Sequence, residues 1–311
     1  MKRRLWGEKP YYSFDYYLKT TYGQKLYKVA LNAGMTCPNR DGTLGERGCI
    51  FCSAKGSGDF SESAKLSVSR QIDSGWKTVA EKFKASSCIA YFQAFTNTYA
   101  PVSYLRKIFW EAASHPRVKI LSIATRPDCL EEEVLDLLEE INRVKPVWIE
   151  LGLQTIHEDT AKLIRRMYPL STFEDCVTRL KRRGIPIIVH TITGLPGESL
   201  SRMLETIHYL NSAGIQGIKL QLLHVLEGTD LAELYRRSFF PVLSLEEYVS
   251  TTGSLIAHLD PSIVIHRLTG DGPSDSLLAP RWSTKKRHVL NQIHSYLKQQ
   301  DIWQGKEVDH G

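Results

Sequence analysis

Residues 37–52 read Cys37-Pro38-Asn39-Arg40-Asp41-Gly42-Thr43-Leu44-Gly45-Glu46-Arg47-Gly48-Cys49-Ile50-Phe51-Cys52 and contain three of the six cysteines of the chain. No fourth cysteine lies nearby in the sequence. Three thiolates are one ligand short of a tetrahedral zinc site or of a four-cysteine iron–sulfur cluster. A metal site that is one ligand short keeps a position open for a substrate or cofactor. Because the aromatic Phe51 directly precedes the last cysteine, the stretch suggests an open [4Fe-4S] cluster that binds S-adenosylmethionine.

The composition of the 311 residues is ordinary for a soluble globular protein, with 42% hydrophobic and 24% charged residues. No stretch approaches the roughly 20 apolar residues that a membrane span needs, and no apolar signal core follows the basic N-terminus. We therefore expect a cytoplasmic protein without a membrane partner. In a reducing cytosol, clustered thiols more often bind metal or catalyse than form disulfides. The net charge of +6 permits an anionic partner such as RNA.

Strand-like and helix-like segments alternate along most of the chain. Near-continuous apolar strands favour a parallel sheet covered by helices. About six strand–helix units are fewer than the eight of a closed (β/α)8 barrel, so we expect an α/β fold with a partial, TIM-like (β/α)6 barrel. The predicted strands are 25–31, 88–95, 118–124, 146–153, 185–192 and 217–223, and the predicted helices are 67–84, 101–114, 130–143, 172–183 and 199–213.

The chain changes character from about residue 243 onward. The pattern there predicts a helix over 245–258, a strand over 263–267 and a helix over 284–299. We interpret residues 1–35 as a segment that leads into the first barrel strand and residues 25–242 as the barrel core. Residues 243–311 are then an α+β extension that packs against the open edge of the barrel.

Polar residues follow the carboxyl ends of the predicted strands, which is where the active sites of parallel α/β folds lie. Such a polar ring above an apolar barrel is the expected arrangement for a cofactor enzyme. Its members are the cysteine loop, residues 93–98, 125–128, Glu150, Gln154, 194–198, His224 and 228–229.

Five runs of sequence carry a resemblance to a known family. They are the cysteine loop, Tyr91–Thr98, Glu150–Thr155, Gly194–Glu198 and Arg267–Asp271. On these residues the chain resembles radical S-adenosylmethionine (SAM) enzymes, in particular the YtqA subgroup, called MnmL in a tRNA-modification role and related to the Elp3-like radical proteins. The resemblance extends from about residue 10 to the C-terminus. The common superfamily motif has three residues between its first two cysteines, whereas this chain has eleven. The longer spacing suits the Elp3-like branch.

The resemblance implies a role for the three clustered cysteines. Cys37, Cys49 and Cys52 would hold three irons of the cluster, and the amino and carboxylate groups of SAM would chelate the fourth. The alternative for the same cysteines is a structural zinc site that a distant His or Cys completes. The scattered thiols are interpreted as small buried hydrophobic residues, and these are Cys88, Cys129 and Cys176.

The resemblance also implies a set of SAM contacts. Thr96 and Asn97 stand where the superfamily usually has Gly-Gly-Glu, although they could equally form a turn that caps a helix. Glu150 is a carboxylate inside an apolar strand, and such a residue is rarely buried unless it is paired. It suits the ribose or amino group of SAM, or alternatively a buried salt bridge to a barrel arginine. The other candidates are Phe51, Gly194 and Pro196 near the adenine, and Gln154 in the same role as Glu150.

The reaction implied by the resemblance begins with reductive cleavage of SAM. A reduced cluster gives one electron to the sulfonium, and the resulting 5′-deoxyadenosyl radical takes a hydrogen atom from the substrate. For the YtqA subgroup the implied substrate is a tRNA wobble uridine, whose carboxymethylaminomethyl group becomes aminomethyl on the route to mnm5s2U. A one-electron donor such as flavodoxin or ferredoxin would supply the electron to the enzyme. The alternatives are a radical enzyme acting on a small metabolite or a protein, and a zinc-stabilised RNA-binding module.

Overall fold

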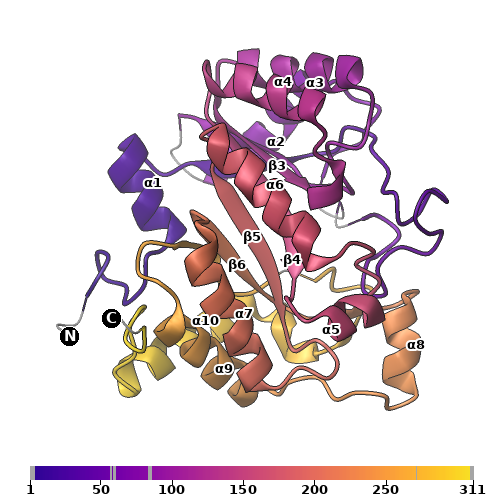
Figure 1. Ribbon diagram of the computed structural model, residues 1–311. Coiled ribbons are helices and arrows are strands. Elements are labelled where there is room, and N and C mark those ends of the chain that lie inside the picture. Colours follow the sequence, from indigo (N-terminus) through magenta and orange to yellow (C-terminus); the bar gives the residue numbers. More distant parts are fainter. Residues whose placement is uncertain (1–3, 57, 59–60, 83–85, 271, 309–311) are drawn as a thin grey trace.

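The computed structural model describes residues 4–56, 58, 61–82, 86–270 and 272–308. Lys84, at the end of a predicted helix, and Asp271, in the last of the five runs, lie outside these residues. At the centre is a curled sheet of seven strands, each parallel to its neighbours (Figure 1). In sheet order the strands are β1 (Tyr27–Leu31), β2 (Cys88–Phe92), β3 (Val118–Thr125), β4 (Val147–Gln154), β5 (Ile187–Thr193), β6 (Gly217–Leu222) and β8 (Val264–Arg267).

Helices cover the outer face of this sheet, and the main apolar core lies between the two layers (Figure 1). The covering helices that follow barrel strands are α2 (Val68–Lys82), α3 (Val102–Ser114), α4 (Glu132–Asn142), α6 (Leu170–Arg182) and α7 (Leu200–Ala213). In the C-terminal part, α9 (Leu245–His258) packs against α7, and α10 (Lys286–Gln299) packs against α9. The α/β half-barrel with a C-terminal extension predicted from the sequence is thus confirmed, and the extension supplies β8 as the seventh strand.

The inner face of the sheet is built in layers because alternate residues of a strand point to the same side. An apolar layer at the amino ends of the strands contains Ile89, Ile120, Trp148 and Ile188. Helix α1 (Phe14–Tyr22) packs against this layer, and its Phe14 ring lies 5.9 Å from that of Trp148. The next inward positions of the same strands, two residues further on, carry polar side chains. The barrel floor is therefore apolar and closed, and the polar groups lie above it.

Several short elements were not predicted from the sequence. Helix α1 is capped by Ser13, whose side chain accepts a hydrogen bond from the Tyr16 N–H. The others are α5 (Glu158–Leu163), α8 (Asp230–Arg236), the antiparallel pair β7 (Val225–Leu226) and β9 (Leu277–Ala279), and two 3-10 turns at Pro127–Cys129 and Arg281–Thr284. Among the described residues, no helix has the length and apolar character needed to span a membrane.

Candidate active site

The cysteine loop is folded by hydrogen bonds among its own residues. The Gly48 N–H donates to the Asn39 carbonyl at 2.6 Å, which closes the segment between Cys37 and Cys49 into a compact turn. The Cys52 N–H donates to the Cys49 carbonyl at 3.0 Å, so the last two cysteines share one tight turn. The long spacing between the first two cysteines is therefore taken up inside the loop.

Asn39 and Arg40 hold this loop in place. A guanidinium nitrogen of Arg40 donates to the Cys52 carbonyl at 2.8 Å. Asn39 is 2% exposed, and its amide donates to the Arg165 carbonyl at 2.9 Å. Gly48 has a φ of 72°, and a Cβ there would lie 2.8 Å from Nε of Arg40. A glycine is required at this position because the arginine passes directly over it.

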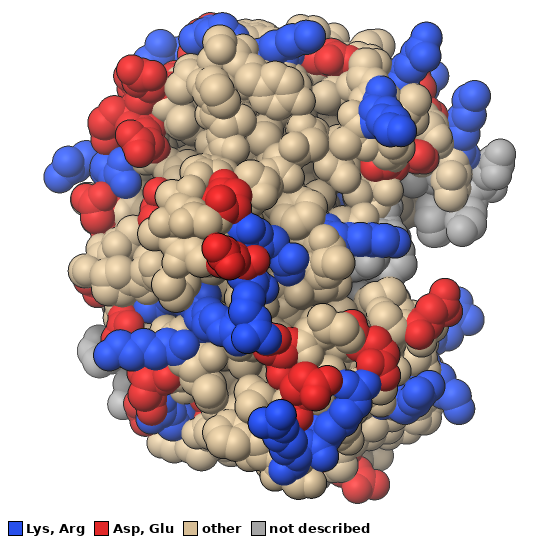
Figure 2. All heavy atoms as spheres, turned by 90° about the vertical axis from the view of Figure 1, so that its right-hand side faces the viewer, with Lys and Arg blue, Asp and Glu red and all other residues tan. Residues whose placement is uncertain are grey.

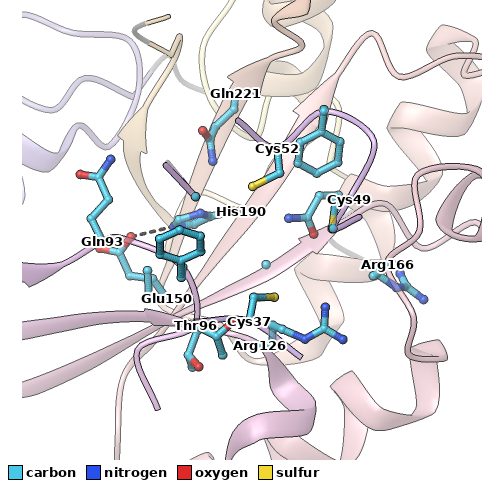
Figure 3. A pocket seen from close by; sticks show the side chains of 18 of the residues that line it. Cys37, Cys49, Cys52, Gln93, Thr96, Arg126, Glu150, Arg166, His190 and Gln221 are labelled. Carbon is cyan, nitrogen blue, oxygen red and sulfur yellow. Dashed lines mark hydrogen bonds and ion pairs between the residues drawn. The ribbon is translucent and has the colours of Figure 1, made fainter. Parts of the chain in front are cut away.

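The loop borders a pocket of about 190 Å³ at the carboxyl ends of the strands. All three clustered cysteines line the pocket, and Figure 3 shows them on one side of it, with Glu150 and His190 on the other. Of the SAM contacts suggested by the sequence, Phe51, Thr96, Glu150 and Gln154 line this pocket, whereas Asn97, Gly194 and Pro196 are not among its lining residues.

Asn97 joins two strands rather than facing the pocket. It is fully buried, and both its side-chain amide and its backbone N–H donate to the Ala124 carbonyl, at 2.8 and 3.2 Å. These bonds tie the loop after β2 to the end of β3. Its neighbour Thr96 is 2% exposed and does line the pocket. A role in binding thus fits Thr96 better than Asn97.

Gln154 ends β4 in an unusual backbone conformation. Its φ is 67°, and the pairing with β5 shifts register between Gly152 and Gln154. The side-chain amide folds over Gly152, since a Cβ on that glycine would lie 2.9 Å from Nε2. Oε1 is buried without a hydrogen-bond partner beside the pocket. An unpaired buried acceptor is costly, so this position suits a ligand that donates a hydrogen bond.

Glu150 is fully buried, and protein donors occupy both of its oxygens. Oε1 accepts from Lys28 at 2.5 Å and from the Ser122 hydroxyl, and Oε2 accepts from Lys219 and from Nε2 of His190 at 2.7 Å. Burial disfavours the carboxylate, but Lys219 and Lys28 hold the pKa of Glu150 well below its usual range. A carboxylate offers about four acceptor positions, so these four donors saturate it. The buried salt bridge is present, with two lysines in place of an arginine.

The pKa values of two residues that contact Glu150 are also shifted. Burial and the nearby Lys219 lower the pKa of His190 to about 4, so the imidazole is neutral at pH 7 and donates to Glu150. Burial also lowers the pKa of Lys219 well below its usual range, while Glu150 opposes that shift. Lys219 donates to the Tyr91 hydroxyl at 3.0 Å. We call Lys28, Tyr91, Glu150, His190 and Lys219 the charged layer.

A second cavity of about 460 Å³ adjoins the first. Tyr91, His190, Lys219 and Arg267 line both spaces. Lys28 lines the second cavity but is not among the residues that line the cysteine pocket. The site therefore has a cysteine end and a roomier end beside the charged layer.

The cysteine end fits an iron–sulfur cluster. None of the three thiols is in a disulfide, and they border the same space. Burial and the neighbouring Cys52 raise the pKa of the Cys49 thiol to about 12, so metal binding must displace its proton. The Asn39 amide lies 3.5 Å from the Cys49 sulfur and can donate to it. Among the described residues, no group of three or more His, Cys, Asp or Glu side chains could hold a metal ion. A [4Fe-4S] cluster does not require the three thiolates to bind one ion, because each cysteine binds a different iron.

Comparison with known proteins places the chain in a family. Residues 40–210 match the model of the radical SAM superfamily, and residues 215–299 match that of the radical SAM C-terminal domain. The chain belongs to the radical SAM superfamily. The resemblance drawn from the cysteine loop is thereby confirmed, and the protein is a radical SAM enzyme.

Three relatives illustrate the place of this radical SAM enzyme within the superfamily. It is 42% identical to the uncharacterized protein YtqA of Bacillus subtilis, over 96% of this chain and 93% of that one. It is 25% identical to the tRNA uridine(34) acetyltransferase of Methanocaldococcus infernus, over 62% of this chain and 35% of that one. The solved structure of Elp3 from Methanocaldococcus infernus superimposes with a TM-score of 0.69 at 16% identity, covering 90% of this chain and 64% of that one. That likeness shows the fold alone.

Some residues of this radical SAM site were not predicted from the sequence. Lys28 and Lys219 are lysines inside strand segments. Such a charged residue in a strand could have been recognised as a paired, buried group in the same way as Glu150. Arg126 lies in the polar run 125–128 that was expected at the end of a strand, and it lines the cysteine pocket and makes two hydrogen bonds to Asp128, at 2.9 and 2.7 Å. His190 donates to Glu150 and lines both cavities.

Proposed function

We propose that this radical SAM enzyme holds a [4Fe-4S] cluster on Cys37, Cys49 and Cys52, binds SAM beside it and modifies the wobble uridine of tRNA. The reaction proposed is conversion of carboxymethylaminomethyl-uridine to aminomethyl-uridine, on the route to mnm5s2U. One observation carries the proposal: the three cysteines border a pocket that continues into a second, larger cavity. A cofactor site then lies next to space for a substrate.

The cluster and SAM, when bound, would supply one-electron cleavage chemistry and hydrogen-atom abstraction. The residues of this chain would position them and exclude water. Gln154 offers an unpaired Oε1 to an amine or hydroxyl of SAM. Thr96 and Phe51 line the same pocket, and the Phe51 ring suits the face of the adenine. Glu150 acts through the lysines that it holds, because its oxygens are already occupied.

Support for tRNA comes from a relative and from the surface. The tRNA uridine(34) acetyltransferase shares 25% identity with this chain, and position 34 is the wobble position. Figure 2 shows the face that lies on the right of Figure 1, where α5 and α8 lie. Lys and Arg side chains form a band across its middle and lower parts, mixed with Asp and Glu. The target base would leave its stack to reach the interior, and flavodoxin or ferredoxin would supply the electron.

Nucleoside analysis tests this proposal. tRNA from cells that lack the protein is digested before and after incubation with the reconstituted enzyme, SAM and a reductant. We expect carboxymethylaminomethyl-uridine to fall and aminomethyl-uridine to rise in equal amounts. SAM cleavage without any change in tRNA nucleosides would favour a small metabolite or a protein as the substrate. Zinc in place of iron and sulfide in protein purified without air would favour the RNA-binding module.

A further inference from the structure

Among the described residues, the barrel interior beside the second cavity places two lysine ammonium groups against one carboxylate. Lys28 of β1 and Lys219 of β6 both contact the single carboxylate of Glu150. Glu150 is fully buried, and Lys219 is 5% exposed. His190 adds no charge at neutral pH, because burial and Lys219 lower its pKa to about 4. Two lysines therefore share one carboxylate, and burial lowers the pKa of Lys219 even though Glu150 opposes that shift.

The second cavity offers these lysines no further counter-charge among the residues that the structure describes. Its described lining includes Lys28, Lys219 and Arg267, but no Asp or Glu. Arg267 is left out of this comparison, so the described residues place one carboxylate, that of Glu150, against two lysines. Like charges that are buried together are costly unless an anion compensates them. An anionic ligand in this cavity would therefore stabilise the wall that it touches.

We propose that the second cavity binds a carboxylate group of the substrate, with Lys28 and Lys219 as its cationic partners. Each ammonium group has three N–H donors. Lys28 directs one of them to Glu150, and Lys219 directs one to Glu150 and one to Tyr91, so both lysines keep donors for a ligand. Glu150 is the positioning residue that holds the two ammonium groups. The inference rests on the proposed function for the way the carboxylate arrives, on a carboxymethylaminomethyl-uridine.

The carboxylate of SAM is another source of the same chemistry, and the geometry favours the substrate. Figure 3 shows Arg126 next to Cys37 at the cysteine end, where Asp128 also pairs with it. Lys28 lines the second cavity and is not among the residues that line the cysteine pocket. When a base is flipped into a pocket, the edge of the base lies deepest and the sugar–phosphate backbone stays at the entrance. Its substituent, rather than a phosphate, would reach the charged layer.

Binding of matched RNAs tests the inference without turnover. Two anticodon stem-loops are compared, one with a carboxymethylaminomethyl group on the wobble uridine and one with the corresponding carboxamide. The full chain carries its oxidised cluster and SAM, so no reaction starts. We expect the acid to bind about ten- to a hundred-fold more tightly than the amide, the range for a charge-assisted hydrogen bond. Equal affinities for the two RNAs would overturn the proposal.

Variants of Lys28 locate the preference. Lys28→Gln keeps a hydrogen bond to Glu150 but removes the surplus charge, so it should bind acid and amide alike. Lys28→Arg keeps the charge and should retain a preference for the acid. Lys119→Gln is the matched control, because Lys119 is an exposed lysine on β3 of the same sheet. A preference that survives in Lys28→Gln would contradict the assignment.

Two further measurements separate this inference from its rivals. The affinity for SAM should be unchanged in Lys28→Gln, and a loss of SAM binding that matches the loss of acid preference would assign the lysines to the cofactor instead. If neither RNA binds, the proposed function fails. The subsite is then judged with N-benzylglycine against N-benzylglycinamide by calorimetry. Selective binding of the acid by the wild type, lost in Lys28→Gln, would support the carboxylate subsite, and no selectivity would reject it.

Discussion

The two ends of the active site are built in opposite ways. At one end, Cys37, Cys49 and Cys52 lie on a single loop whose turns are closed by its own backbone. At the other end, the charged layer comes from strands that are far apart in the sequence. The carboxylate of Glu150 bonds to a lysine 122 residues before it and to another 69 residues after it. A loop can absorb an insertion while its ends stay in place. A layer across a barrel needs every strand in register, because a slip of one residue turns a side chain to the other face.

The two ends also differ in what holds them. The cysteine loop is fixed by donors to carbonyl oxygens, which include the Asn39 amide and the Arg40 guanidinium. The charged layer consists of groups that are costly to bury unless they are paired. Loss of function should therefore follow changes at the cysteine end, and loss of stability should follow changes in the charged layer.

The largest effect is expected at the cysteine end. Cys49→Ala, like the same change at Cys37 or Cys52, should abolish the brown colour and the SAM cleavage of the reconstituted protein. Wild type should bind about four irons per chain, as the cluster type requires. Because the loop is held by its own hydrogen bonds, the unfolding transition of the metal-free variant should remain close to that of wild type.

Cys176→Ala is the matched control for this prediction. Cys176 is a buried thiol of α6 in the main core, so its replacement should retain the cluster and cost only a little stability. A full complement of iron in Cys49→Ala would contradict the cluster assignment.

The second prediction concerns the charged layer, where we expect a loss of stability. Glu150→Gln leaves the buried Lys219 and the partly buried Lys28 without their anion, and removing one partner of a buried pair costs about 3–5 kcal/mol. Denaturant unfolding of the metal-free chain should show this loss of free energy. The double variant Glu150→Gln/Lys219→Met should recover part of it, because one unpaired cation is gone. A loss below about 1 kcal/mol in the single variant would remove the contrast between the two ends.

The same contrast explains what could be predicted from the sequence. The half-barrel followed from apolar runs, and the proposed cluster site followed from a motif that is complete within one loop. The partners of Glu150 could not be found this way, because they come together only after the strands pair. Helix α1 escaped prediction because residues 14–22 are rich in aromatic and β-branched side chains. Its packing under the barrel, with Phe14 against Trp148, favours the helix over local propensity.

The third prediction uses pH to tell the ends apart. Burial and Lys219 lower the pKa of His190 to about 4, against about 6.5 in the unfolded chain. Between these values the unfolded state binds more protons, so stability is fully present above pH 6.5 and falls as the pH drops to about 4. The loss should reach about 3 kcal/mol. His190→Gln cannot titrate and should flatten this part of the curve.

Cys49→Ser is the control at the cysteine end, because burial and Cys52 place the pKa of the Cys49 thiol far above this window. The metal-free variant should show the same acid sensitivity as wild type. A residual slope in His190→Gln is expected, since burial and Lys28 also lower the pKa of His266. An unchanged slope in His190→Gln would mean that the charged layer does not set the acid sensitivity.

The smallest effect is expected at the outer edge of the cysteine end. Arg47 pairs with Asp230, but its side chain is 70% exposed and Asp230 also pairs with Arg165. Exposed pairs contribute about 0–1 kcal/mol, so Arg47→Ala should leave the free energy of unfolding nearly unchanged. If this face contacts tRNA, the same variant should lower the slope of log affinity against log salt by about one unit. Lys119→Ala, on the sheet and away from the loop, should leave that slope as it is. A stability loss in Arg47→Ala as large as that of Glu150→Gln would show that surface charge, and not burial, separates the two ends.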